Sequence, residues 1–530
     1  MSLLQCLSFS FKDTLNILLF SVFLYISHFY YQYFTRVNKL PGPFPLPIIG
    51  SVCIPILLLA FQLLLQKQYG DVFEVWLSNK RKIYLCRVEH WDKLLSSSTK
   101  TKWLSRMGTN EGLHELGMNQ RGILANDNLD SWKFNRYFFN QAMLTPSFNI
   151  KAIDATNKIW KEMELYWNTL GNDYQIELSQ WMQRFTIDMI IEITTGKRAY
   201  TLPVYFNTFT TKKIVDIPSA ILDDSEYFIH NIQKYVAAFT TFAIFPYYIR
   251  HYVPILKNFT KIGIESRDNI NGKIMDIIKN RRKEIEEKND NDMVFNDMLS
   301  LLIVANTEKD NNKGSRPDLR PMTDDEIMGN IRDAFIGGSE TTTNAICVLV
   351  YYICKHPKVL KKLRQELDAV FGEDHDRPFT SDDISKLKYC EAILYEAGRM
   401  HPIAHSTSRV NTEPDELLGY QWPARSEFIM FFDGANKHPL YWKDPEIFNP
   451  DRFLDDNIVK RNFILFGKGI RQCPGKKLAM IEMIGIMAML FRKYDVTLIN
   501  EELHYKSMLF NSIIEGMFVK LTPRKDVIFN

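Results

Sequence analysis

Residues 466–475 constrain this chain more than any other stretch of its sequence. They read Phe-Gly-Lys-Gly-Ile-Arg-Gln-Cys-Pro-Gly, which places Cys473 at the end of a basic, glycine-rich turn. An apolar run over 478–490 follows and is typical of a buried helix. A sulfur at the mouth of a helix meets free N–H groups and the positive end of the helix dipole, so it can stay deprotonated at neutral pH. The stretch predicts a thiolate ligand; the competing interpretation is a buried structural cysteine.

The neighbours of Cys473 favour a flat ligand that carries carboxylates. Gly469 and Gly475 let the backbone approach a planar group and adopt turns that a side chain would forbid. Arg471 supplies a planar cation suited to a carboxylate, and Phe466 supplies an apolar face. Together these residues indicate a haem site, with sulfur on the iron, the cation on a propionate and apolar contact against the ring.

The spacing Phe-x-x-Gly-x-Arg-x-Cys-x-Gly resembles the signature of the cytochrome P450 monooxygenases. The resemblance covers nearly the whole chain and implies one large, mainly α-helical unit with a smaller β-rich part. It further implies that haem b lies between the helix after the cysteine loop and a helix that carries Gly-Gly-x-Glu-Thr. By the same resemblance, Cys473 is the axial ligand of the haem iron and Phe466 shields its sulfur from solvent.

A helix that begins at Thr323 with a capping box and ends near His356 is predicted to carry that second feature. It contains two adjacent glycines, 337 and 338, and each costs about 1 kcal/mol relative to alanine inside a helix. A groove left over the iron would compensate for this cost, whereas close packing between helices is the alternative. The resemblance implies that Glu340 and Thr341 supply the protons used in dioxygen cleavage.

Three more residues are expected at the haem propionates. Trp132 and Arg136 lie four residues apart and share one face of a predicted helix. The pattern alone is common on protein surfaces, but the resemblance implies that the pair reaches a propionate. Arg409 stands at the place from which a second cation reaches a propionate in the family.

A structural triad is implied beneath the cysteine loop. Glu396 and Arg399 are three apart on a helix predicted over 386–400, which suits an ion pair on one face. In the family such a pair is buried and joined by an arginine from further along the chain, and Arg452 supplies it here.

The N-terminal region predicts a membrane anchor over residues 1–39. Residues 14–35 contain no Asp, Glu, Lys or Arg and as a helix would span about 33 Å, enough for a hydrocarbon core of about 30 Å. Arg36 and Lys39 follow, so the positive-inside rule places the rest of the chain in the cytosol. The alternative is a cleaved signal peptide.

The remaining chain divides into two parts. The proline-rich stretch 40–50 predicts a stiff hinge, and residues 51–530 predict the haem-thiolate catalytic domain. The apolar stretch 52–65 is expected to form a buried or interfacial helix, with a membrane-dipping segment as the alternative. Residues 72–77 and 83–88 predict a β-hairpin.

Charge, cysteine spacing and the lack of a dinucleotide-binding motif indicate which kinds of partner and ligand to expect. A net charge of +3 with 24% charged residues indicates no nucleic-acid binding. The seven cysteines are scattered, which argues against a disulfide framework or a zinc site and fits a cytosolic domain. No dinucleotide-binding fingerprint follows a predicted strand, so electrons are expected from an NADPH-dependent reductase in the same membrane, by resemblance that of the endoplasmic reticulum. The aromatic-rich region 150–260 suggests a hydrophobic small-molecule substrate; the alternative is that its helices only pack together or contact the membrane.

A monooxygenase is therefore the predicted function. Two alternatives are a haem-thiolate isomerase or dehydratase that needs no reductase, and a membrane-anchored haem sensor without turnover. The complete Gly-Gly-x-Glu-Thr stretch argues against both.

Overall fold

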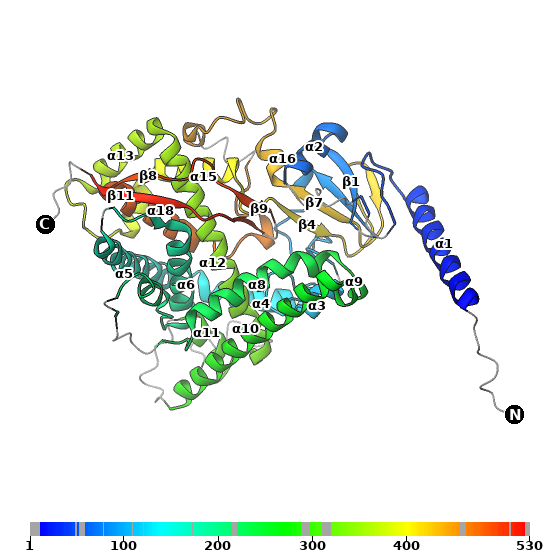
Figure 1. Cartoon of the computed structure of the whole chain (residues 1–530), viewed down its shortest axis with the longest axis horizontal. Helices are drawn as coiled ribbons and strands as arrows, with labels where there is room; N and C mark the ends of the chain where they lie inside the picture. The colour runs from blue at the N-terminus through cyan, green and yellow to red at the C-terminus, as the bar shows by residue number, and fades with distance from the viewer. Residues whose placement is uncertain are drawn as a thin grey trace.

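Helices form most of the protein, and its sheets are small (Figure 1). This computed structural model describes residues 11–47, 50–51, 59–77, 79–108, 110–119, 121–171, 173–211, 213–214, 220–287, 297–309, 320–455, 463–507 and 510–524. The longer helices are α1 (Phe11–Thr35), α2 (Leu59–Tyr69), α4 (Leu129–Met143), α5 (Pro146–Leu170), α6 (Leu178–Thr195), α8 (Ser225–Ile244), α10 (Pro254–Glu287), α12 (Asp324–Lys355), α13 (Pro357–Phe371), α15 (Lys388–Met400) and α18 (Lys476–Lys493). Short helices are α3 (Glu111–Glu115), α7 (Thr201–Phe206), α9 (Tyr247–Tyr252), α11 (Met298–Val304), α14 (Ser381–Lys386) and α16 (Phe432–Asn436), with 3₁₀ turns η3 (Val88–Trp91), η5 (Pro450–Phe453) and η6 (Gly469–Arg471).

The strands lie in four separate sheets among the described residues. They are β1 (Val72–Leu77), β2 (Lys80–Leu85), β3 (Ile176–Glu177), β4 (Ser406–Val410), β5 (Asp415–Leu417), β6 (Tyr420–Trp422), β7 (Glu427–Phe431), β8 (Tyr494–Leu498), β9 (Tyr505–Ser507), β10 (Asn511–Ile513) and β11 (Phe518–Pro523). The largest sheet has the order β1-β2-β7-β4 and lies on the side from which α1 projects (Figure 1). The others are β3-β11-β8, β10-β9 and β5-β6. The prediction of a mainly helical unit with a smaller β-rich part is confirmed.

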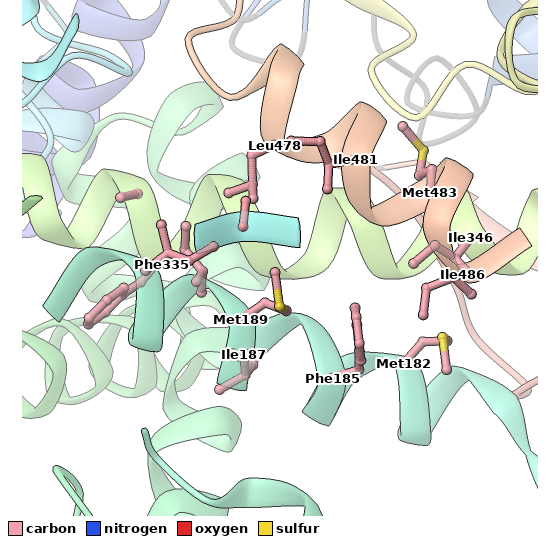
Figure 2. Close-up of a cluster of buried hydrophobic side chains, with 14 of the residues drawn as sticks. Met182, Phe185, Ile187, Met189, Phe335, Ile346, Leu478, Ile481, Met483 and Ile486 are labelled. Atoms are coloured by element: carbon pink, nitrogen blue, oxygen red, sulfur yellow. The ribbon is translucent and has the colours of Figure 1, made fainter. Parts of the chain in front are cut away.

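Helix α12 runs through the core between α6 and α18 (Figure 2). Phe185 and Met189 of α6, Phe335 of α12, and Leu478 and Ile486 of α18 are among the buried side chains that join the three helices. Each such side chain contributes about 1.5–3 kcal/mol when it is fully buried. This packing fixes the start of α18, and with it the cysteine loop, against the middle of α12.

The limits of α12 follow the sequence signals. The Thr323 hydroxyl accepts the N–H of Glu326, and the Glu326 carboxylate accepts the N–H of Thr323, so the predicted capping box is present. The helix ends at Lys355, and Pro357 occupies the first turn of α13.

Two other predicted elements differ in their bounds. The second strand of the hairpin is Lys80–Leu85 rather than 83–88, because Leu77 already pairs with Lys80. The helix predicted over 386–400 is two helices, because Leu387 leaves the helical region between α14 and α15 (φ −82°, ψ 62°).

The end of α1 is fixed to the largest sheet. Within α1, Asp13–Thr35 is long and apolar enough to cross a membrane. Just after it, Arg36 pairs with Glu74 of β1 at 2.5 Å, and the Glu74 N–H donates to the Pro41 carbonyl at 2.9 Å. The described part of the proline-rich stretch therefore packs along β1.

Three N-terminal predictions fall partly outside the described residues. Residues 1–10 of the expected anchor, 48–49 of the expected hinge and 52–58 of the apolar stretch are not described. Residues 59–65 of the apolar stretch lie in α2, and Leu65 is buried against the largest sheet.

The implied triad forms and is buried. Arg399 donates through Nε and Nη2 to the two oxygens of Glu396 at 2.7 and 2.9 Å, and Arg452 Nε donates to Glu396 Oε1 at 3.1 Å. Arg399 also donates to the carbonyls of Asn436 and Pro445 at 2.9 and 2.7 Å. The triad thus ties α15 to the segment that leads toward the cysteine loop.

Replacing Glu396 with alanine is expected to lower the free energy of unfolding by about 3–5 kcal/mol, because Arg399 keeps a buried charge without its partner. Denaturant unfolding measures this loss. The matched control is Glu265→Ala, which breaks the exposed ion pair with Lys261 and should cost less than about 0.5 kcal/mol. Equal losses in the two variants would contradict the structural role of the triad.

Candidate active site

A cavity of about 520 Å³ lies between α12, the loop before α18 and strand β4. Residues expected from the sequence line much of it, namely Trp132, Arg136, Thr341, Arg409, Phe466, Arg471, Cys473 and Gly475. Gly469 and Glu340 are not part of this lining. The triad residues Glu396, Arg399 and Arg452 lie behind it and contact one another instead.

The Cys473 sulfur is accessible from the cavity although its loop lies deep in the protein. Burial raises the pKa of the Cys473 thiol, while the N–H groups of Gly475 and Lys476 and the guanidinium groups of Arg106 and Arg136 lower it. Burial has the larger effect. The helix start and the nearby cations therefore offset only part of the effect of burial on this pKa, and a metal ion that binds the thiol would displace its proton.

The two glycines of the cysteine loop have different environments. Gly469 has φ +71°, and a Cβ there would lie 2.1 Å from the Leu95 carbonyl oxygen and 2.5 Å from that of Ser96. Gly469 thus permits the close approach of neighbouring backbone and is not part of the cavity lining. A Cβ at Gly475 would meet only the Cys473 sulfur, at 3.9 Å, so this glycine leaves the sulfur accessible.

Arg471 and Trp132 form a stacked pair at the cavity wall. The guanidinium carbon of Arg471 lies 3.8 Å from the centre of the Trp132 ring. Arg471 donates to the carbonyls of Leu104, Ile123 and Asn126 at 3.0–3.2 Å, and the indole N–H of Trp132 also donates to Ile123, at 3.1 Å. Trp132 therefore orients Arg471.

Three further guanidinium groups converge on the same region. Arg136 of α4 donates to the Gln472 carbonyl at 2.6 Å, and Arg409 of β4 donates to the Ser408 carbonyl at 2.7 Å. Arg106 donates to the Arg471 carbonyl at 3.1 Å. The Nε atoms of Arg106 and Arg136 are buried and have no hydrogen-bond partner in the described part of the chain.

These four arginines, 106, 136, 409 and 471, are called the arginine cluster below. Among the described residues, no carboxylate lies within 4.0 Å of any of them. Burial, reinforced by repulsion from Arg106, lowers the pKa of Arg136 to about 10 and that of Arg409 to about 9. Burial and the other three cations lower the pKa of Arg471 well below its usual value.

Buried charge of one sign is costly unless an anion neutralises it. The two propionates of a haem would supply two negative charges to the arginine cluster, while Cys473 would supply the sulfur ligand. The residues present therefore fit a haem.

The two adjacent glycines of α12 have different surroundings. A Cβ at Gly337 would meet nothing within 4 Å beyond its own helix, so this position leaves open space beside the cavity. A Cβ at Gly338 would lie 2.7 Å from Cγ1 and Cδ1 of Ile190 on α6. Both glycines line the cavity, so close helix packing is present at Gly338 and open space at Gly337, and the groove over the iron stays a prediction.

Glu340 and Thr341 point in different directions. The Thr341 hydroxyl lines the cavity and donates to the Gly337 carbonyl at 2.6 Å. Glu340 turns away and accepts a hydrogen bond from the Ser512 hydroxyl of β10 at 2.7 Å. Burial raises the pKa of Glu340, and the Ser512 hydrogen bond and the Lys506 charge oppose this rise.

Sequence reasoning missed two residues of the site, Arg106 and Asp333. Asp333 of α12 accepts the N–H groups of Ile123 and Leu124 at 2.7 and 2.8 Å, and the Leu124 carbonyl accepts from Arg106 at 3.2 Å. Neither residue has a recognisable spacing. The one local signal is Gly122, with φ +68°, where a Cβ would lie 2.3 Å from an Asp333 oxygen.

Comparison with known proteins agrees with this site. The family model for Cytochrome P450 matches residues 40–528. Cytochrome P450 4d2 of Drosophila melanogaster is 24% identical over 502 residues, covering 92% of this chain and 94% of that protein. Aromatase of Homo sapiens is 25% identical over 429 residues, covering 81% and 76%. A self-sufficient cytochrome P450 monooxygenase of Oidiodendron maius is 23% identical over 495 residues, covering 91% and 41%.

Alanine at the two glycines of α12 is expected to have opposite effects on stability. Gly338→Ala should lower the free energy of unfolding by about 1–3 kcal/mol, because the new methyl group overlaps the stiff Ile190 side chain. Gly337→Ala should raise it by up to about 1 kcal/mol through helix propensity while narrowing the cavity. Chemical unfolding of both variants tests the difference, and a larger loss for Gly337→Ala would contradict the assignment.

Arg409→Leu is expected to weaken haem binding without lowering the stability of the haem-free protein. The haem-free variant should be as stable as the parent or about 1–4 kcal/mol more stable, because a buried unpaired cation is removed. Haem transfer to an acceptor globin should be faster, because a propionate loses its partner. Arg282→Leu, which removes a cation paired with Asp324 outside the cavity lining, should leave haem transfer unchanged. Unchanged transfer in Arg409→Leu would contradict its role.

Proposed function

The chain belongs to the cytochrome P450 family and is a haem-thiolate monooxygenase, and from this premise we propose its reaction and partners. One oxygen atom of O₂ enters a C–H bond of a hydrophobic organic substrate, and the other leaves as water. The balanced reaction consumes two electrons and two protons: RH + O₂ + 2 e⁻ + 2 H⁺ gives ROH + H₂O. NADPH supplies the electrons through a separate reductase.

One observation carries the assignment: a cavity-facing sulfur stands beside cations that lack a carboxylate partner in the described part of the chain. Cys473 would bind the haem iron through its sulfur, and the arginine cluster would hold the propionates. The bound haem supplies the electron transfer and oxygen chemistry that side chains lack. Phe466 lies against the cavity beside the loop and limits access of water to the sulfur.

The chain's own residues supply protons and space. Thr341 presents a hydroxyl at the cavity, and Gly337 leaves room beside it. Glu340, one residue earlier on the same helix, passes protons from outside the cavity toward Thr341. Apolar side chains such as Ile190, Phe239 and Phe510 line the space and favour a hydrophobic substrate.

The electron donor and the cellular location of the protein are the next part of the proposal. Cytochrome P450 proteins need a redox partner, and we assign that role here to a separate NADPH-dependent reductase. Residues 1–39 anchor the protein in a membrane, residues 40–50 join the anchor to the catalytic domain 51–530, and Arg36 and Lys39 favour a cytosolic domain. We assign the membrane to the endoplasmic reticulum.

Thr341→Ala tests the reaction. A spectral binding screen over sterols and fatty acids selects the substrate, and turnover is then measured with NADPH and reductase. Product per NADPH should fall at least about 10-fold with matching release of hydrogen peroxide, because a positioned proton donor contributes about 10²–10⁴-fold. Thr341→Ser keeps the hydroxyl and should retain coupling.

Two results would contradict the proposal. Unchanged coupling in Thr341→Ala would remove the role of this hydroxyl. Turnover of a hydroperoxide without NADPH, with no product when NADPH, reductase and O₂ are present, would make the protein an isomerase or dehydratase.

A further inference from the structure

The hairpin β9–β10 contacts α12 beside the cavity, and Phe510, just before β10, lines the cavity. Its Ser512 hydroxyl donates to Glu340 Oε1 at 2.7 Å, and both side chains are largely shielded from solvent. The other carboxylate oxygen, Glu340 Oε2, is buried and has no hydrogen-bond partner within the described ranges. Glu340 is therefore held through one oxygen, by a residue 172 positions later in the chain.

Two asparagines fix the hairpin in this position. Asn344 of α12 accepts the N–H of Ile513 at 2.9 Å and donates to the Glu340 carbonyl at 2.7 Å. On the other side, Asn511 donates through its side chain and backbone to the carbonyls of residues 402 and 403, at 2.7 and 2.8 Å. The hydroxyl between them thus has a defined place against the carboxylate.

The hairpin also connects this carboxylate to solvent. Lys506 of β9 is exposed and pairs directly across the strands with Ser512. Its positive charge stabilises the ionised form of Glu340. An exposed ammonium, a shielded hydroxyl and a shielded carboxylate therefore follow one another from the surface to α12.

A serine hydroxyl suits the middle position because it donates one proton and accepts another. A lysine at the surface offers protons from solvent, and a carboxylate is the strongest acceptor of a hydroxyl proton among neutral-pH side chains. Glu340 and Thr341 are neighbours on α12: Thr341 lines the cavity, whereas Glu340 lies outside the lining and contacts the hairpin. Lys506, Ser512, Glu340 and Thr341 therefore lie in the order that a proton route from solvent to the cavity needs.

We propose that Ser512 is the positioning residue through which Glu340 regains its proton in each turnover. Ser512 gives its hydroxyl proton to the Glu340 carboxylate and takes one proton from solvent on the Lys506 side, so its own protonation is unchanged after each transfer. Glu340 then releases that proton toward Thr341. This inference rests on the proposed monooxygenase reaction and adds the route by which its two protons enter.

Ser512→Ala in the haem-loaded, full-length protein tests the route. The substrate is the sterol or fatty acid with the largest spectral shift, and turnover uses NADPH and reductase. Product per NADPH should fall about 3–10-fold, hydrogen peroxide release should rise correspondingly, and the solvent deuterium isotope effect on product formation should increase. Ser512→Thr keeps the hydroxyl and should restore coupling to within about 2-fold.

Two further measurements separate proton supply from a structural role. Turnover driven by added hydrogen peroxide, which brings its own protons and electrons, should be within about 2-fold of the parent in Ser512→Ala. In a Glu340→Gln background, Ser512→Ala should cause no additional loss. Ser385→Ala, whose hydroxyl donates to the carbonyl of Asp382 in its own helical turn, is the matched control and should behave like the parent.

The outcomes decide the proposal. It is overturned if Ser512→Ala keeps its coupling, if Ser512→Thr fails to restore it, or if the peroxide-driven reaction falls equally. If Ser512→Ala fails to bind haem, Ser512→Cys replaces it, with the same loss expected. Failure of the proposed function looks different, because the parent protein would then give no product with NADPH and reductase.

Discussion

The site depends on positive charge that the described protein does not neutralise. Four guanidinium groups lie together beside the cavity, and backbone carbonyls rather than carboxylates hold them. Carbonyl oxygens orient a cation but leave its full charge in a poorly polarisable interior. Such a cluster is favourable only with an anion, and a haem with two propionates is an anion of the right kind. The cluster thus links folding of the cavity to binding of the cofactor.

Helix α12 connects this cofactor site to the outside of the protein. At Gly338 it packs on Ile190 of α6, and at Gly337, Gly338 and Thr341 it borders the cavity. Glu340 lies on another face and contacts the hairpin β9–β10. One helix therefore brings together close packing, open space and a titratable group, because successive side chains point in different directions around its axis.

Local patterns were sufficient to predict part of the site. The cysteine loop, the capping box of α12 and the Glu396–Arg399 pair each lie within a few residues, so spacing alone describes them. Arg106 could not be predicted, because the fold brings it to Arg471 across 365 residues. The partner of Gly469 was likewise missed, since a sequence does not show which backbone approaches a glycine. The same reason hid Ser512, whose partner lies on a distant helix.

The bond between Cys473 and the haem iron is the central claim, and the carbon monoxide spectrum of the reduced protein tests it most directly. The haem-loaded parent protein should show a Soret band shifted to the position that a thiolate ligand gives. Cys473→Ser should lose that band together with its oxidising activity. If the serine variant keeps both the shifted band and the activity, another group binds the iron and the account is wrong.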